Sequence, residues 1–322
     1  MIQTLNPALG DVRNPYVVVS ARDLLTQPYT EPTFLVEHLI PERSVVLLSA
    51  DSGAGKTSFM LNAVFSLGLG MPIANRFGAF GTRPTLYVNG EMSTGTLVRF
   101  MYATIAGLGV DVEECASEKV LFEGANGLTN FFLAINDKTA ADYIEGLLER
   151  VRPQLIVLDT FRSLFEADEN KSREVREVFA WLRRLCEAYD LSIVVSHHLR
   201  KLSQVSNNQR ERVSGSRDLI AAVDTHVTMR SPSGRPVNAL VLDKTRTPHA
   251  GIAAGCEWPI DARWIDGSPP RSTFTAGDPA GERTGADDVA QEEILALVAT
   301  EGPLTVRDLD ASGGARKRAL ET

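Results

Sequence analysis

The chain has 322 residues, of which 43% are hydrophobic, and it carries a formal net charge of −8. This length and composition can bury one large core with a smaller appended segment, and the acidic balance restricts any contact with nucleic acid to local basic segments. The three cysteines are scattered and odd in number, which argues against disulfides and zinc fingers and favours free thiols in a reducing cytoplasm. No apolar run reaches the length of a membrane span, and residues 1–20 lack a signal-peptide pattern, so we expect a cytoplasmic protein without a membrane partner.

Strand and helix patterns alternate through the middle of the chain. We interpret residues 1–40 as an N-terminal extension and residues 41–262 as the core domain. The alternation predicts an α/β fold with a doubly wound, mostly parallel sheet and helices on both faces. The predicted strands are Val45–Ser49, Thr85–Asn89, Leu155–Asp159, Ser192–Ser196, Thr225–Met229 and Ala239–Asp243. The predicted helices are Thr57–Leu67, Ser93–Ala106, Lys138–Val151 and Ser172–Tyr189.

A nearly complete phosphate-binding loop lies between the first strand and the first helix. The predicted ATP-binding residues are Ala50, Asp51, Ser52, Gly53, Ala54, Gly55, Lys56, Thr57 and Ser58, with Ala50 where glycine is usual. The glycines let backbone N–H groups turn toward a phosphate, and the helix N-terminus adds its dipole. We expect Lys56 to reach the β- and γ-phosphates and the Thr57 hydroxyl to ligate Mg²⁺. The loop therefore predicts ATP and Mg²⁺ as cofactors.

Two further strands lead into carboxylates. Leu155–Asp159 is an apolar strand that ends in an acid, so we predict that Asp159 faces the Mg²⁺ beside Thr57. Glu91 follows the strand Thr85–Asn89, and this placement separates RecA-like ATPases from AAA+ proteins, in which the catalytic Glu adjoins the aspartate. We expect Glu91 to orient and partly deprotonate the attacking water. A surface charge at a helix N-terminus is the alternative.

A pair of histidines ends the next core strand. Adjacent strand residues point to opposite faces, so His197 and His198 cannot easily share one metal ion. A polar group at this strand end can touch the γ-phosphate and relay its loss to the following loop. We assign this catalytic role to His197 and a structural role to His198.

The composition changes after the core. Glycine, proline, serine and threonine dominate residues 263–286, which we interpret as a flexible linker. Residues 287–322 carry two short helical patterns and the basic stretch Arg316–Arg318, and they resemble the first part of a winged-helix domain. A partly ordered polar tail is the alternative.

Five features, in their order along the chain, resemble RecA-like hexameric P-loop ATPases and most closely the plasmid RepA replicative helicases. They are the phosphate loop, the strand before Glu91, Asp159 with residues 166–170, the histidine pair, and Gly215-Ser216 before a further strand. The resemblance covers roughly residues 20–262, and DnaB and KaiC are more distant relatives. It implies a RecA-like core, six-membered rings and a nucleotide held between neighbouring subunits.

The resemblance also implies where a neighbouring subunit and DNA would act. In such motors a Lys-x-Arg pair reaches the neighbour's γ-phosphate, and Lys244 and Arg246 have that spacing; their charge would stabilise the transferring phosphoryl group. The basic segment from Arg200 to Arg217 corresponds to the loop that lines the central channel. The predicted DNA-binding residues, which would grip a single-strand backbone without reading bases, are Arg200, Lys201, Arg210 and Arg212. Solvated basic turns are the alternative for both segments.

The leading interpretation is an ATP-driven ring motor on single-stranded DNA, of the replicative-helicase type used by plasmids, phages or other mobile elements. The alternative is a nucleotide-switched DNA-binding or assembly ATPase without unwinding activity, which the acidic charge and the absence of aromatic residues in the basic segment favour. A small-molecule kinase fits less well, because it needs no Lys-Arg pair. The expected partners are further copies of this chain in a hexamer, single-stranded DNA, and replication or mobile-element proteins.

Overall fold

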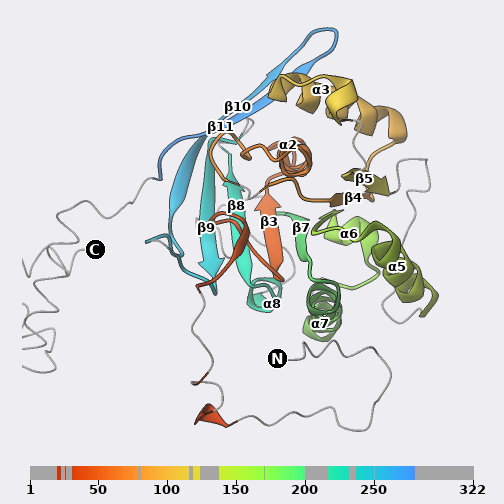
Figure 1. Ribbon diagram of the computed structural model, residues 1–322, viewed down its shortest axis with the longest axis vertical. Helices are drawn as coiled ribbons and strands as arrows, with labels where there is room; N and C mark the ends of the chain where they lie inside the picture. Colours follow the sequence, from red (N-terminus) through yellow and green to blue (C-terminus); the bar gives the residue numbers. More distant parts are fainter. Residues whose placement is uncertain are drawn as a thin grey trace, which may run out of the picture.

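The structure is a computed structural model that describes residues 20–22, 26, 31–78, 81–115, 119–123, 138–169, 171–199, 217–231, 237–249 and 251–279. Within these residues nine strands form one sheet, and helices lie on both of its faces (Figure 1). A separate pair of short strands packs beside them. Among the helices that the structure describes, none is both long and apolar enough to cross a bilayer.

The strands of the large sheet are β3 (Val45–Ala50), β4 (Thr85–Asn89), β5 (Val120–Glu123), β6 (Leu155–Asp159), β7 (Ser192–His198), β8 (Thr225–Arg230), β9 (Ala239–Thr245), β10 (Glu257–Ile265) and β11 (Arg271–Ala276). Their order across the sheet is β11-β10-β9-β8-β3-β7-β6-β4-β5. The pairings from β8 to β5 are parallel, and those from β8 to β11 are antiparallel. The predicted α/β class and mostly parallel sheet are confirmed, and the arrangement is RecA-like.

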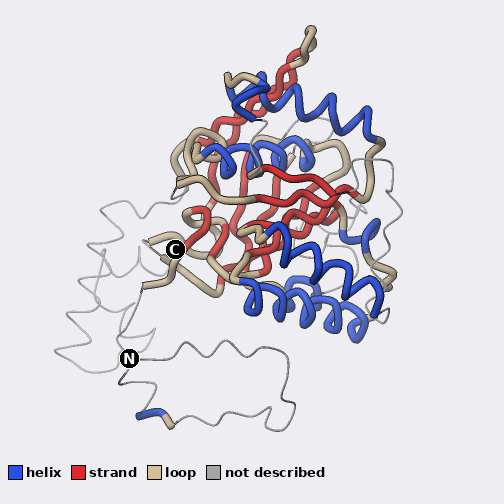
Figure 2. Tube along the Cα trace, turned by 45° about the vertical axis from the view of Figure 1, so that its right-hand side comes forward, coloured by secondary structure: helices blue, strands red, loops and turns tan. Residues whose placement is uncertain are grey.

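The helices are α2 (Lys56–Leu69), α3 (Thr94–Leu108), α4 (Val112–Cys115), α5 (Lys138–Val151), α6 (Phe161–Leu164), α7 (Ser172–Tyr189) and α8 (Arg217–Ala222). Helices α2 and α3 cover one face of the sheet, while α5, α6 and α7 cover the other (Figures 1 and 2). Each face has its own apolar cluster, and neighbouring strand residues divide between them. Val194 packs in the cluster under α2, for example, and Val195 packs in the cluster under α7.

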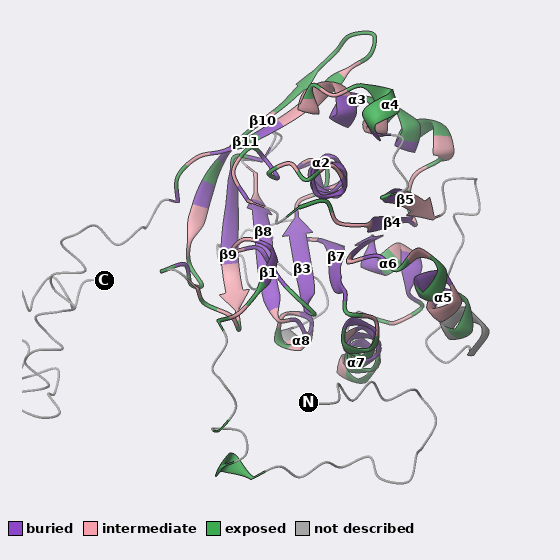
Figure 3. Cartoon of the chain, viewed as in Figure 1, coloured by how far each residue is buried: buried purple, intermediate pink, exposed green. Residues whose placement is uncertain are grey.

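The central strands are buried on both faces. Every residue of β3, β4 and β6 is buried, as the buried strands between the helices in Figure 3 show. Parallel strands covered on both sides read as continuous apolar runs rather than as alternating ones. This is why the predicted strands agree with the observed ones within two residues at each end, and the predicted helices agree equally closely.

The core begins earlier in the chain than the sequence interpretation placed it. Strands β1 (Phe34–Val36) and β2 (Ile40–Pro41) pair antiparallel. Leu35, Val36 and Ile40 of these strands, together with Leu39, join the cluster under α2. The assignment of residues 1–40 to an extension is therefore wrong for residues 34–40, because these residues complete the core.

The segment interpreted as a linker contains a β-hairpin. Strands β10 and β11 pair antiparallel over Ile260–Ile265 of the first strand. On β11 every second residue is buried, namely Ser272, Phe274 and Ala276. This period of two is the pattern of a strand with one face toward the core.

The interpretation of residues 263–286 as a flexible linker is therefore wrong for residues 263–276. The glycine and prolines of residues 267–270 form the connection between two strands, and turn composition alone does not distinguish a hairpin from a linker. The core consequently extends past residue 262. The winged-helix-like segment, residues 287–322, lies outside the described residues.

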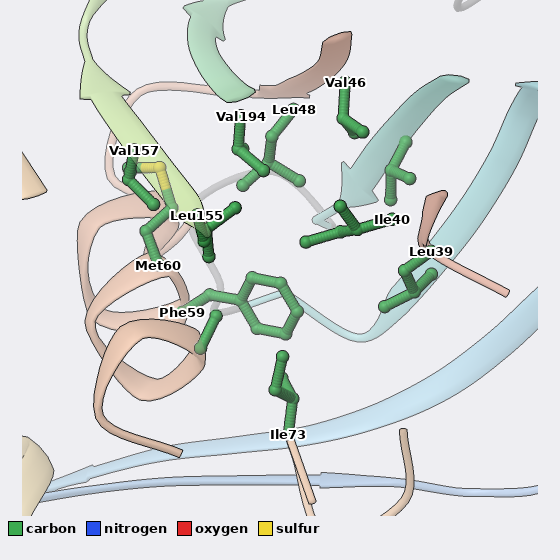
Figure 4. A pocket seen from close by; sticks show the side chains of 12 residues that line it. Leu39, Ile40, Val46, Leu48, Phe59, Met60, Ile73, Leu155, Val157 and Val194 are labelled. Atoms are coloured by element: carbon green, nitrogen blue, oxygen red, sulfur yellow. The ribbon is translucent and has the colours of Figure 1, made fainter. Parts of the chain in front are cut away.

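A small apolar cavity lies between α2 and the sheet. Phe59 and Met60 of α2 line it on one side, and Leu155 and Val194 of the sheet line it on the other (Figure 4). Every described residue that lines the cavity has an apolar side chain. Since an apolar cavity removes packing contacts without offering water a partner, filling it is expected to stabilise the fold.

Val194→Ile is expected to raise stability toward unfolding by up to about 0.8 kcal/mol, because it adds one methylene group beside this cavity. Val195→Ile is the matched control, since Val195 is the next residue of β7, is fully buried and faces the opposite cluster. Overpacking there is expected to cost about 1 kcal/mol or more. Urea midpoints of the two variants measure the difference. Equal shifts for both would contradict the account of the cavity.

Candidate nucleotide-binding site

The phosphate loop turns between the end of β3 and the start of α2. Gly53 and Gly55 have φ values of 79° and 94°, in the left-handed region where a side chain is strained. Gly55 is also the N-cap of α2. The loop therefore presents a helix N-terminus at the carboxyl edge of a parallel sheet, where α/β proteins bind anions.

Lys56 is folded back over this loop. Its ammonium group is buried and donates to the carbonyl oxygens of Ala50 and Asp51, at 3.3 and 3.4 Å. It also lies 3.0 Å from Nδ1 of His198. Burial lowers the pKa of Lys56, while the carboxylates of Asp159, Glu91 and Asp51 act in the opposite direction. A phosphate in the loop would add negative charge beside this buried cation.

Asp159 lies beside the loop and accepts hydrogen bonds from three hydroxyl groups. Its Oδ2 accepts from Thr57 Oγ1 at 3.0 Å and from the Tyr87 hydroxyl at 2.5 Å. Its Oδ1 accepts from Ser196 Oγ at 2.6 Å. Burial, followed by the charge of Asp159, raises the pKa of Tyr87 well above its ordinary value, so the phenol keeps its proton and donates. Sequence reasoning found Thr57 and Asp159 but missed Tyr87 and Ser196.

The donor set at Thr57 and Asp159 fits Mg²⁺. Mg²⁺ prefers oxygen ligands and retains several waters, so one hydroxyl and one nearby carboxylate suffice when phosphate oxygens complete the shell. The 3.0 Å separation of Thr57 Oγ1 and Asp159 Oδ2 places both oxygens next to one position. The pairing of these two residues, predicted from separate motifs, is present in the structure.

Glu91 lies at the rim of the site. The Asn89 side chain builds the turn that carries it, accepting from the Met92 N–H at 3.0 Å and donating to the Met92 carbonyl at 2.7 Å. The Glu91 carboxylate is half-exposed and lies 3.7 Å from Nε2 of His198. Thr160, and not an acid, follows Asp159. Glu91 is thus the carboxylate that the strand next to β6 brings toward Lys56.

The two histidines have positions opposite to those expected. His198 contacts Lys56 and Glu91 at the nucleotide loop, whereas His197 is 2% exposed and lies 3.4 Å from Glu169 and near the ring of Phe161. The placement of His197 at the nucleotide loop is therefore wrong, and His198 is the histidine that lies beside Lys56 there.

Strand alternation explains the exchange. Val194, Ser196 and His198 lie on the face of β7 that carries α2, because side chains alternate along a strand. Val195 and His197 lie on the opposite face, under α6 and α7. Burial and the nearby Lys56 charge lower the pKa of His198, so its ring is neutral at neutral pH and Nδ1 can accept from the Lys56 ammonium group.

Lys244 and Arg246 lie near the amino ends of the parallel strands, whereas their own phosphate loop lies at the carboxyl ends. The loop follows Ala50, which pairs with Met229 near the end of β8. Strand β9 runs antiparallel to β8, and Lys244 pairs with His226 near the start of β8. Met229 and His226 are three residues, or roughly 10 Å, apart along β8, and the side chains of Lys244 and Arg246 extend toward α8. These cations cannot contact the phosphate loop of their own chain.

Both cations hold the end of α8 and the two residues after it. The Lys244 ammonium group donates to the carbonyl oxygens of Ile220, Ala221 and Val223 at 2.6, 3.2 and 2.7 Å. Arg246 donates to the carboxylate of Asp224 at 3.1 Å. Burial, followed by the charge of Arg246, lowers the pKa of Lys244 to about 8. The Arg246 side chain is about half-exposed.

The four predicted DNA-binding residues, Arg200, Lys201, Arg210 and Arg212, lie outside the described residues. In the sequence they fall between β7, which carries His198, and α8, which Lys244 contacts.

Comparison with known protein families is consistent with a nucleotide-binding site at this loop. No curated protein matches the chain. A family model described as an AAA domain matches residues 12–204, which include the phosphate loop, Glu91, Asp159 and both histidines, whereas β8 to β11 lie beyond the match. Since the match covers more than half of the chain and contains the geometry described above, the chain belongs to this AAA-domain family of P-loop ATPases.

Proposed function

We propose that the protein is an ATP-hydrolysing ring motor that acts on single-stranded DNA, of the replicative-helicase type used by plasmids, phages or other mobile elements. The position of Arg246 carries this proposal. It lies at the sheet edge opposite Lys56, so it can assist phosphoryl transfer only at the site of another copy. A site divided in this way requires an oligomer, and a closed ring, proposed to be a hexamer, repeats the same interface without leaving an unused half.

Each residue of the nucleotide site has a proposed task. Lys56 and the loop bind the phosphates, and Thr57 with Asp159 would hold Mg²⁺, which neutralises phosphate charge when bound. Glu91 orients the attacking water and takes up its proton. The neutral ring of His198 contacts Lys56, so it can respond when the terminal phosphate leaves. Phosphoryl transfer depends chiefly on such positioning and on charge.

The proposed DNA contact follows from connectivity. The basic segment with Arg200, Lys201, Arg210 and Arg212 joins β7 to α8 in the sequence. In the sequence it begins two residues after His198, which contacts Lys56, and it leads into α8, the helix whose end Lys244 contacts. A strand bound to this segment could therefore respond to two neighbouring nucleotide sites.

The competing proposal is a nucleotide-switched DNA-binding or assembly ATPase without unwinding activity, which the net charge of −8 favours. A forked duplex with a labelled strand separates the two proposals. Strand release that requires both ATP and Mg²⁺, and that is absent with Lys56→Ala protein, supports the motor. ATP hydrolysis with DNA binding but no release supports the switch.

Glu91→Gln is expected to keep ATP binding while reducing turnover by about 10²- to 10⁴-fold, since it removes only the base that orients water. Lys56→Ala is expected to lose nucleotide affinity instead. Glu177→Gln, on the exposed part of α7, is the control for the substitution itself. Binding of a fluorescent ATP analogue and steady-state phosphate release measure the two effects. Turnover near the wild-type rate in Glu91→Gln protein would remove this residue from the mechanism.

Arg246→Ala is expected to bind ATP normally and to hydrolyse it about 10³-fold more slowly, the loss typical of a missing arginine finger. Mixing it with Lys56→Ala protein should restore part of the activity, because some interfaces would then join an intact loop to an intact Arg246.

Arg43→Ala is the matched control for Arg246→Ala. Arg43 precedes β3 at the same sheet edge and is paired with Asp190, much as Arg246 is paired with Asp224. Normal turnover of Arg246→Ala protein, or full activity in a sedimenting monomer, would exclude the divided site.

Replacing Arg200, Lys201, Arg210 and Arg212 by Gln is expected to weaken single-strand binding and to flatten its salt dependence. Each lost phosphate contact lowers the slope of log K against log salt by about 0.7. Replacing Arg316, Lys317 and Arg318 by Gln is the control at the other basic segment. An unchanged slope in the first variant and a reduced slope in the second would move the DNA contact to the C-terminal segment.

A further inference from the structure

The carboxylate of Asp159 is flanked on both sides by hydroxyl groups from neighbouring strands. In the sheet β6 lies between β4 and β7. Strand β4 supplies the phenol of Tyr87 to Oδ2, and β7 supplies Ser196 to Oδ1. Only Thr57, the third donor, belongs to the phosphate-loop helix. Two of the three donors, Tyr87 and Ser196, are therefore not among the predicted Mg²⁺ ligands.

The register of the sheet places these donors. Asn89 pairs with Asp159, so Tyr87 lies two residues back on the neighbouring strand and on the same face. The Tyr87 side chain is long enough to reach the Asp159 carboxylate from this position, and a shorter side chain would not reach it. On the other side, Leu158 pairs with Val195, which brings Ser196 level with Asp159.

Burial makes these hydrogen bonds strong constraints. Tyr87 and Ser196 are fully buried, and Asp159 is 1% exposed. A buried carboxylate without donors is costly, and hydroxyl-to-carboxylate bonds in such surroundings are short and directional. With one oxygen held from each side, the carboxylate cannot rotate about its Cβ–Cγ bond without losing both partners.

We propose that Tyr87 is a positioning residue for Mg²⁺ binding, which together with Ser196 fixes the orientation of the Asp159 carboxylate beside Thr57. The proposal rests on the proposed function of this site as an Mg²⁺–ATP site. Groups that orient a metal-binding carboxylate typically change metal affinity or activity by about 10- to 100-fold when removed. The Tyr87 hydroxyl donates to Asp159 at 2.5 Å and also interacts with the Thr57 side chain, so its effect on Mg²⁺ would pass through these two residues.

Tyr87→Phe is the direct test, because it removes the hydroxyl group and retains the aromatic ring. The centroid of this ring lies 5.7 Å from that of Phe122. Tyr143→Phe is the matched control. The Tyr143 hydroxyl also donates to a carboxylate, that of Glu123 at 2.8 Å, but this pair is exposed and far from the loop in the sequence. Binding of a fluorescent ATP analogue is measured across an Mg²⁺ titration and in EDTA.

The Tyr87→Phe protein is expected to need about 10-fold or more Mg²⁺ for half-maximal nucleotide binding, with unchanged affinity in EDTA. Turnover should recover at high Mg²⁺, and Tyr143→Phe should match the wild type throughout. Ser196→Ala, which frees the other carboxylate oxygen, is expected to shift the same midpoint and serves if Tyr87→Phe does not fold.

A Tyr87→Phe protein that loses thermal stability but keeps the wild-type Mg²⁺ midpoint would overturn the proposal, since the hydroxyl would then be purely structural. This outcome is distinct from failure of the proposed function. If the wild-type protein binds the nucleotide equally well with Mg²⁺ and in EDTA, or does not bind it, the site itself is misassigned.

Discussion

The parallel pairing of β3, β7, β6 and β4 is the constraint on which the nucleotide site depends. It brings four carboxyl ends to one edge, in a register that sets Ala50 beside His198 and Asn89 beside Asp159. The phosphate loop, the acid, the histidine and the turn that carries Glu91 all begin at these ends. A slip of one residue in any pairing would turn the relevant side chain to the other face. Burial on both faces prevents such a slip.

Strand periodicity also decides which of two similar residues takes part. His197 and His198 are adjacent and chemically identical, yet one contacts Lys56 and the other is buried near Glu169. The antiparallel step from β8 to β9 has a comparable effect at larger scale, because it returns the chain to the far edge of the sheet before Lys244 and Arg246. Direction and alternation of strands, rather than proximity in sequence, assign the functional positions.

How much the sequence could predict depended on how local the signal was. The loop, Asp159 and the helix boundaries were predictable, because apolar runs and a contiguous motif specify them. The choice between the histidines was not, since β7 is apolar on both faces and shows no alternation from which a face could be read. Tyr87 carries no motif and acquires its partner only through the pairing of β4 with β6. The hairpin was concealed by turn-rich composition around residues 267–270.

That hairpin bears on where an independently folding fragment can end. Phe274 of β11 packs edge-on against Phe59 of α2, with ring centroids 5.5 Å apart. The backbone of Ser272 lies so close to Gly107 of α3 that a β-carbon there would collide with it. A chain cut at residue 204, where the family match ends, or at residue 262 would expose these faces of α2 and α3 to water. The helix that presents Lys56 thus relies on residues remote from every nucleotide motif, and the smallest stable ATP-binding unit must extend at least through residue 276.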